Sequence, residues 1–240
     1  MVEAESCIPP DPKISKMNRL ADGVMKAAQL ACCLEVSGYP KPGNVHRLRD
    51  FPDTSFEQFL AGSIALGPSM RTAFLRGAAA ALETIEVRDI HLGRIIESAV
   101  KDVLKAHRGG NTHLGIALLF TPLAAGMGYV AAPDVSSDRF EEEILSKGYT
   151  LESILRVSKQ WDIVAFEIVE NYPITFTEGL PFFRDMASKY DLNTAIVHLF
   201  LHILSRHPDT FIARKVGLKQ TVDIQEAVKN RYGKGLRSIP

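Results

Sequence analysis

A loop rich in ionisable side chains follows the first predicted helix of this 240-residue chain. The loop begins with residues 38–43, where two prolines and two glycines favour extended or turn geometry and exclude a helix. Basic, acidic and amide side chains lie close together along it: Lys41, Asn44, His46, Arg47, Arg49, Asp50 and Asp53. Such side chains could bind anions and a metal ion, although a solvated turn would have a similar composition.

Glu35 lies at the end of the helix that precedes this loop. It follows Ala28 by seven residues and Ala31 by four, which places its carboxylate on the apolar face of the helix. A carboxylate there either pairs with a cation, such as Lys41 or a metal ion, or has a raised pKa and can act as a general acid. The alternative is that the last helical turn frays and Glu35 reaches water.

A second candidate site is the segment Gly-Gly-Asn-Thr-His-Leu-Gly at residues 109–115, directly before a long apolar stretch. Glycines let a backbone approach a ligand closely, Asn111 or Thr112 can cap the helix, and free N–H groups at a helix start attract anions. The Gly-Lys-Ser/Thr ending of a P-loop is missing. The segment therefore predicts either an anion site or a plain helix cap.

Acidic residues also occur between residues 162 and 170. Asp162 aligns with apolar residues of the following turns, so we expect it to point inward, whereas we expect Glu167 and Glu170 to be exposed. An inward acid predicts either a functional group or a buried salt bridge with one of the loop arginines.

His198 and His202 have the spacing of four residues that zinc sites on helices use, and Asp209 follows them. No Glu lies between the two histidines in the metalloprotease arrangement, so we expect them to serve in packing.

Helices are predicted to position all of these residues. Apolar residues recur at helical spacing in five segments, while the alternation typical of strands is nearly absent. The segments are 20–34, 56–64, 70–85, 92–106 and 192–204, and residues 133–138 and 172–181 are predicted loops. We predict an all-α fold, with one globular multi-helix domain over residues 18–240 after a flexible leader, residues 1–17.

Composition limits the classes of partner. Lys plus Arg and Asp plus Glu both number 28, so the net charge near zero gives no reason to expect nucleic acid or a membrane surface. Three cysteines without metal-site spacing favour reduced thiols and a cytoplasmic protein. Residues 109–133 lack charge and are about long enough to cross a bilayer, but glycines and polar residues dilute the segment. We predict a central buried helix there.

Several motifs occur in the order found in one known family. They are Pro40-Lys41-Pro42-Gly43-Asn44-Val45-His46 with Asp50-Phe51, Gly110-Asn111-Thr112 with Leu114-Gly115 and Pro122-Leu123, Asp162 to Glu167 with the segment 175–181, and Pro208-Asp209-Thr210. Over about residues 28–217 the chain resembles the triphosphoribosyl-dephospho-CoA synthases. The resemblance implies an all-helical enzyme that joins ATP to dephospho-CoA with loss of adenine.

The resemblance also implies roles for individual residues. It assigns phosphate binding to six residues: Lys41, Asn44, His46, Gly110, Asn111 and Thr112. Metal or acid/base chemistry falls to Glu35, Asp50, Asp53 and Asp162, and the first three of these are the candidate ligands of a Mg²⁺ ion that accompanies ATP.

Three alternatives to this function are open. A relative could use another acceptor in coenzyme biosynthesis or hydrolyse the glycosidic bond, and a non-catalytic helical module could keep only the nucleotide pocket. Retention of Glu35, Asp50, Asp53 and Asp162 favours an enzyme over the module. The expected partners are ATP and a dephospho-CoA-like acceptor, in a monomer or a homo-oligomer.

Overall fold

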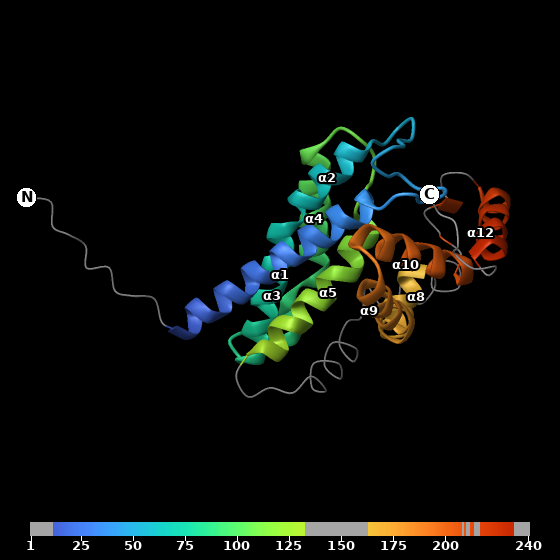
Figure 1. Cartoon of the computed structure of the whole chain (residues 1–240). Helices are drawn as coiled ribbons and strands as arrows, with labels where there is room; N and C mark the ends of the chain where they lie inside the picture. The colour runs from blue at the N-terminus through green and yellow to red at the C-terminus, as the bar shows by residue number, and fades with distance from the viewer. Residues whose placement is uncertain (1–11, 133–162, 208, 210–211, 214–216, 233–240) are drawn as a thin grey trace, which may run out of the picture.

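The computed structural model describes residues 12–132, 163–207, 209, 212–213 and 217–232. Among these residues there is no β-strand, and the only β-type pairing is two isolated bridges in the loop, His46 with Arg49 and Phe51 with Thr54. The predicted all-α fold is confirmed (Figure 1).

Most of the predicted helices are present with bounds close to those predicted. The elements are α1 (Pro12–Ser37), α2 (Phe56–Ala65), α3 (Gly67–Ala81), the 3₁₀ helix η1 (Val87–Ile90), α4 (Leu92–Ala106), α5 (Leu114–Ala131), α8 (Ile163–Val169), the π-helix η2 (Ile174–Gly179), α9 (Leu180–Lys189), α10 (Leu192–Arg206) and α12 (Leu218–Tyr232). Helix α1 starts at Pro12, so residues 12–17, which we predicted as part of the leader, are helical.

Helices α1 to α5 pack into a bundle around one apolar core (Figure 1). Its tightest pair is α3 with α5, because two glycines face the opposite backbone. A Cβ atom on Gly77 would lie 1.9 Å from the carbonyl oxygen of Ala125, and one on Gly128 would lie 1.8 Å from that of Phe74. Only a residue without a side chain fits at these two positions, so the glycines set the distance between the helices.

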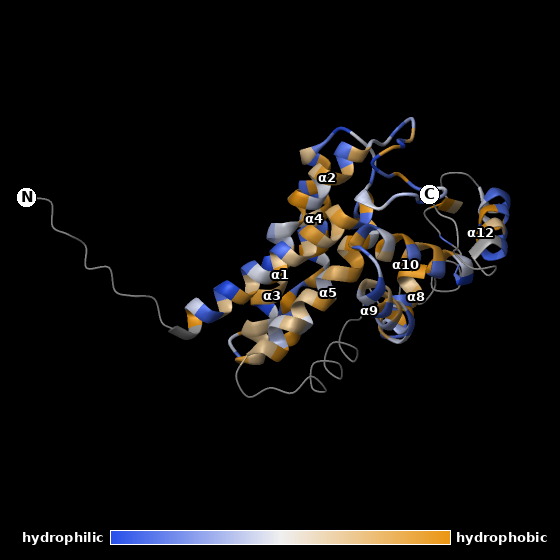
Figure 2. Ribbon diagram, in the orientation of Figure 1, coloured by the Kyte–Doolittle hydropathy of each residue, from blue (hydrophilic) through white to orange (hydrophobic). Residues whose placement is uncertain are grey.

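Helix α5 was predicted to be central and buried, and the structure differs in part. Its buried residues form one face, while Leu114, Met127 and Val130 are exposed among the residues that the structure describes. Figure 2 shows an apolar ribbon over most of its length. By length and composition α5 could cross a membrane, and about a third of it is buried inside the molecule.

Helix α10 forms the centre of a second, smaller core beside the bundle. Its residues Val197, Leu201 and Leu204 pack with Ile212 and with Val228 of α12. Asp191 caps the start of α10, because its carboxylate accepts the Thr194 N–H at 3.1 Å. Figure 1 shows α10 between the bundle and α12, where it can reach the loop after α1.

The predicted loop 172–181 is mostly helical instead, as η2 followed by the start of α9. Proline suggested a break, but Pro173 directly precedes η2 and Pro181 lies in the first turn of α9. Pro173 stands at the start of this helical stretch, where the missing N–H has no intrahelical partner to lose, and Pro181 follows directly on the π-turn that joins η2 to α9.

Candidate active site

The loop between α1 and α2 is fastened to α10 by Asn193. The Asn193 side chain accepts the Tyr39 N–H at 3.1 Å and donates to the Tyr39 carbonyl oxygen at 3.0 Å. Its oxygen also accepts a hydrogen bond from Arg47. Asn193 was not predicted as a site residue, because an Asn in the first turn of a helix gives no sign of a contact 154 positions away.

Lys41 is buried at the centre of this loop, with 1% of its side chain exposed. Its Nζ lies 2.6 Å from Oε1 of Glu35 and 5.8 Å from the centre of the Phe200 ring. The predicted pairing of Glu35 with Lys41 is confirmed. The apolar environment is not found: the alternative in which Glu35 reaches water agrees with the structure, because 48% of its side chain is exposed, although α1 continues to Ser37 without fraying. The charge of Lys41 is thus inside the protein, and its partner carboxylate faces water.

His46 is a buried, neutral donor in the same loop. Its Nδ1 accepts the Leu48 N–H at 3.3 Å, and its ring meets the Tyr39 ring edge to face at 5.1 Å. Burial, and then the nearby charges of Lys41, Arg49 and Arg47, lower the pKa of His46. The imidazole can therefore offer its Nε2–H group to a phosphate, but little positive charge near pH 7.

Asn44 and Gly43 shape the turn after Lys41. The Asn44 N–H donates to the Lys41 carbonyl oxygen at 3.2 Å, and the Asn44 side chain accepts the Val45 N–H at 2.8 Å. Gly43 has a φ of +79°, and a Cβ atom there would lie 3.1 Å from Ile212. The turn therefore needs glycine both for its backbone angle and for its contact with the second core.

Asp50 and Asp53 are both exposed at the start of α2. Asp50 Oδ1 accepts the N–H of Phe56, the first residue of the helix, at 2.8 Å, and Asp53 Oδ1 accepts the Thr54 hydroxyl at 3.1 Å. In the part of the chain that the structure describes, no three His, Cys, Asp or Glu side chains gather as metal ligands. Mg²⁺ at an ATP site commonly takes only one or two carboxylates besides phosphate and water. Metal binding by Glu35, Asp50 and Asp53 stays a prediction, and Asp162 lies outside the described residues.

The second motif lies against the first through Gln58 of α2. Gln58 Oε1 accepts the Ser55 N–H at 3.1 Å, and a Cβ atom on Gly109 would lie 2.1 Å from the same oxygen. Gly109 therefore packs directly on the residue that closes the loop. The loop leads into the first turn of α2, and the glycine-rich segment packs on that turn, so both predicted motifs adjoin the same end of α2 (Figure 1).

Residues 107–113 form a hydrogen-bonded chain behind this contact. His107 Nε2 lies 3.1 Å from Thr112 Oγ1, which lies 2.7 Å from His113 Nδ1, and His113 Nε2 lies 3.1 Å from Ser63 Oγ of α2. Burial lowers the pKa of His113 to about 4. Gly62 makes room for this ring, since a Cβ atom there would lie 2.5 Å from Nδ1.

The residues predicted to bind phosphate in this segment differ in exposure. Gly110 and Asn111 are exposed, whereas Thr112 is buried. Asn111 caps α5, because its Oδ1 accepts the Leu114 N–H at 2.9 Å. The hydroxyl of Thr112 is held between two imidazoles, so the backbone of 109–111 is the part of the segment that a ligand can reach.

Glu167 contradicts its predicted exposure, because 5% of it is exposed. Its carboxylate accepts the N–H groups of Ile174 at 2.7 Å and Thr175 at 2.9 Å, as well as the Thr175 hydroxyl. These groups belong to the first turn of η2, whose N–H groups lack helical partners. Glu167 thus organises the π-helix, while Glu170 is exposed as predicted.

The rings of His198 and His202 stack on different aromatic side chains. His202 Nε2 lies 3.0 Å from Glu178 Oε1 and its ring stacks on Phe182, whereas His198 stacks on Tyr190. Burial alone would raise the pKa of Glu178, but the hydrogen bond from His207 and the neighbouring cationic groups hold that pKa low. The expectation of packing roles for both histidines agrees with these contacts. Asp209 caps a turn by accepting the Ile212 N–H at 2.9 Å.

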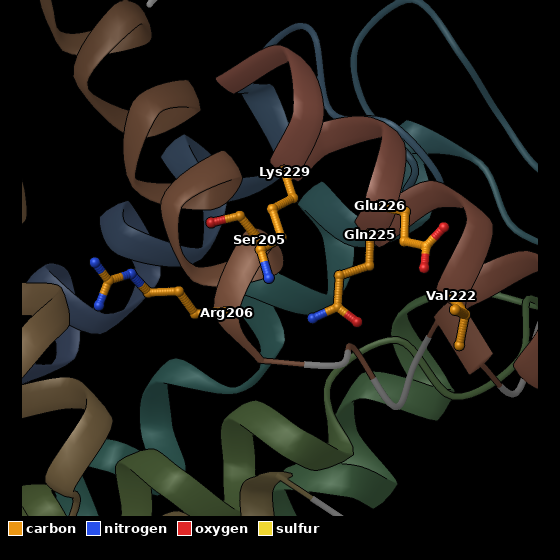
Figure 3. Close-up of a pocket in the computed structure, with 6 residues that line it drawn as sticks. All are labelled: Ser205, Arg206, Val222, Gln225, Glu226 and Lys229. Atoms are coloured by element: carbon orange, nitrogen blue, oxygen red, sulfur yellow. The ribbon is translucent and has the colours of Figure 1, made fainter. Parts of the chain in front are cut away.

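A cavity of about 630 Å³ lies between α10 and α12 (Figure 3). Its lining mixes basic, acidic and amide side chains and includes none of the predicted site residues. In Figure 3 Arg206 points away from the other labelled side chains, consistent with its contact with Glu178 at 3.3 Å.

Comparison with known proteins places this arrangement in a family. A sequence model of the CitG family, described as ATP:dephospho-CoA triphosphoribosyl transferase, matches residues 21–137 and 126–235. No solved structure matches the chain significantly.

Individual relatives are distant but extend over most of the chain. A probable 2-(5''-triphosphoribosyl)-3'-dephosphocoenzyme-A synthase of Streptococcus pyogenes is 27% identical over 226 residues, covering 82% of this chain and 77% of that protein. A Salmonella gallinarum protein with the same description is 25% identical, covering 82% of this chain and 72% of the relative. The Klebsiella pneumoniae 2-(5''-triphosphoribosyl)-3'-dephosphocoenzyme-A synthase is 24% identical, covering 90% of this chain and 78% of its own length. The two matched segments together span most of the described helices, and the chain belongs to the CitG family of ATP:dephospho-CoA triphosphoribosyl transferases.

Proposed function

We propose that this transferase moves the triphosphoribosyl group of ATP to dephospho-CoA or a closely related coenzyme acceptor. Membership of the family supports the reaction. The structural observation that carries the proposal is the contact of Gly109 with Gln58, because it packs the glycine-rich helix start on the first turn of α2, directly after the acidic loop. Carboxylates and free backbone N–H groups at one end of a bundle suit a nucleotide triphosphate with its metal.

The reaction breaks the bond between ribose C1' and the adenine nitrogen and forms a bond from C1' to an acceptor hydroxyl oxygen. The leaving adenine takes up a proton, and the hydroxyl gives up its proton to a base. Positive charge develops on the ribose ring in such reactions, and a nearby carboxylate stabilises it. Asp50 and Asp53, exposed beside the first turn of α2, are our candidates for these tasks, with Asp162 as a further candidate outside the described residues.

Triphosphate binding is proposed for the exposed backbone of 110–111 and for the loop between α1 and α2. His46 can donate one hydrogen bond from Nε2, and Asn44 keeps the turn in place. The Lys41 side chain is buried and its ammonium is paired with Glu35, so any attraction of Lys41 for a bound phosphate is shared with that carboxylate. We therefore propose that Lys41 acts on the site mainly through Glu35, whose exposed carboxylate is available to Mg²⁺.

Product analysis tests the proposal. The protein is incubated with ATP and Mg²⁺, with and without dephospho-CoA, and adenine release is followed by chromatography. Release that requires dephospho-CoA, together with a product heavier by the triphosphoribosyl group, is the expected result. Adenine release without an acceptor would show a hydrolase instead, and absence of release in both conditions, with ATP still bound, would indicate a binding module.

We also propose a cytoplasmic location, where ATP and coenzyme precursors are made. The free thiols of Cys32 and Cys33 are consistent with it. Recovery of the protein in the membrane fraction after cell lysis at moderate salt would contradict this location and direct attention to α5.

A further inference from the structure

His107 joins the two ends of the segment predicted to bind phosphate. Its Nδ1 accepts the Gly109 N–H at 3.1 Å, and its Nε2 lies 3.1 Å from Thr112 Oγ1. One imidazole therefore spans the short stretch 109–112 from its first to its last residue. His107 precedes the glycine-rich motif and is not part of it, so its position does not mark it as a site residue.

The hydrogen atoms of this network can be arranged in only one way that satisfies every contact. At one end the Gly109 backbone N–H must donate, so His107 Nδ1 is unprotonated and its Nε2 carries the proton. At the other end the only hydroxyl hydrogen of Ser63 goes to the Phe59 carbonyl oxygen at 2.7 Å. Ser63 Oγ must then accept from His113 Nε2–H.

The middle of the chain follows from these two ends. With Nε2 protonated and a pKa of about 4, neutral His113 has an unprotonated Nδ1. Thr112 consequently accepts a hydrogen bond from His107 and donates its own hydrogen to His113. Backbone groups fix both ends, and every hydrogen bond runs from Gly109 toward Phe59. Thr112 and His113 are both buried, with 9% and 2% exposed, so water does not replace these partners easily.

We propose that His107 is a positioning residue for the phosphate-binding segment. In its neutral form, with the proton on Nε2, it holds Gly109 and Thr112 at a fixed separation and directs the exposed backbone between them toward the ligand. It does not touch the substrate. The inference rests on the proposed function, because that function makes the exposed backbone of 110–111 a phosphate site.

Two substitutions can separate the two contacts of His107. The amide oxygen of Asn can take the place of Nδ1, and the amide nitrogen of Gln can take the place of Nε2. His107→Asn should therefore keep the Gly109 contact and lose Thr112, while His107→Gln should do the reverse. His107→Ala loses both, and His91→Asn, at an exposed position before α4, is the matched control.

The first measurement is independent of catalysis: ¹⁵N NMR of the histidine side chains in the full-length protein near pH 7.5. We expect His107 and His113 each to show a protonated Nε2 and an unprotonated, hydrogen-bonded Nδ1 in the wild type. His107→Ala and His107→Asn should change the His113 Nδ1 signal, whereas His107→Gln and His91→Asn should leave it in place. A wild-type His113 with its proton on Nδ1 would overturn the network.

The second measurement is the dissociation constant of Mg-ATP, with thermal unfolding as a check that each variant is folded. Each lost contact should weaken binding about fivefold, which corresponds to one ordinary hydrogen bond, and His107→Ala should show about the product of the two single effects. Unchanged ATP affinity in His107→Ala, despite an altered His113 signal, would show a purely structural role and overturn the proposal. Failure of the proposed function is distinguishable, because then the wild type would bind ATP without transferring its triphosphoribosyl group.

Discussion

Two acidic regions of this protein look alike in sequence and differ in the structure. Asp50 and Asp53, before α2, are exposed, and each accepts a hydrogen bond through Oδ1. Glu167 of α8 is buried and its two oxygens accept three hydrogen bonds from η2. An acid whose oxygens are all used for folding has little left for a metal ion or a substrate. The comparison predicts that the loop acids serve the reaction and that Glu167 serves stability.

The largest effect is expected from Glu167→Ala. It leaves two N–H groups in the first turn of η2 without their buried acceptor, and hydrogen bonds to a charged group contribute about 1.5–3 kcal/mol each. We expect a loss of about 4 kcal/mol in the free energy of unfolding, measured by urea titration. Glu170→Ala, at an exposed position on the same turn, should change it by less than about 0.5 kcal/mol. Similar losses in the two variants would remove the distinction between the regions.

His113, a buried histidine, tests whether buried ionisable groups serve stability, through the pH dependence of the free energy of unfolding. The pKa of His113 is lowered to about 4, so the unfolded chain binds a proton below its ordinary pKa near 6.5 while the folded protein does not. The stability from this group is fully present above pH 6.5 and is lost as the pH falls toward 4, about 3 kcal/mol in total.

His113→Gln should remove that part of the pH dependence while keeping a donor for Ser63. The measurement is urea unfolding at several pH values between 4 and 7.5. His91→Asn, a substitution at an exposed position before α4, provides the comparison. A slope that is the same in the wild type and in His113→Gln would assign the acid sensitivity to other groups.

Substitution of a loop acid should lower turnover and leave stability nearly unchanged, whereas substitution of Glu167 should lower stability. In Asp50→Asn the amide oxygen can still accept the Phe56 N–H, so the cap of α2 is retained while the charge is lost. We expect turnover with ATP and dephospho-CoA to fall about 100-fold, with a change in unfolding free energy under about 1 kcal/mol. Asp185→Asn, an exposed acid paired with Lys189 on α9, should keep full turnover. Undiminished turnover and Mg²⁺ dependence in Asp50→Asn would remove it from the site.

The sequence predicted the helices better than the direction of individual side chains. Helical periodicity located α4 and α10 closely, because their apolar residues form continuous stripes. The same reasoning failed for Glu35 and Glu167, since a helix face has no fixed environment until its neighbours are known. Glu167 is buried because the first turn of η2 lies on it, and η2 was itself predicted as a loop.

The candidate site shows the same limit over longer distances. The residues of the loop and of the glycine-rich segment were identifiable from their types, and both adjoin the start of α2. The residues that hold them, Asn193 and His107, have ordinary side chains at ordinary positions. Their importance comes from contacts made after folding, with Tyr39 in one case and with both ends of 109–112 in the other.

The smallest effect on the free energy of unfolding is expected for Glu35 and Lys41, an ion pair with one exposed and one buried partner. The side chain of Lys41 is 1% exposed, while the side chain of Glu35 is 48% exposed. Removing the buried charge leaves a carboxylate that water can solvate, but removing the exposed acid leaves a cation inside the protein without its partner. We therefore expect Lys41→Met to lower the free energy of unfolding by less than about 1 kcal/mol and Glu35→Ala to lower it by about 2 kcal/mol.

Urea unfolding at pH 7 measures this difference, and Glu35→Gln, which keeps an oxygen acceptor for Lys41, should fall between the two variants. A larger loss in Lys41→Met than in Glu35→Ala would mean that Lys41 stabilises the loop mainly by its packing against Phe200 and not by its charge. In that case the carboxylate of Glu35 would be held only weakly by Lys41, and its availability to Mg²⁺ would depend on the ligand and not on a preformed ion pair.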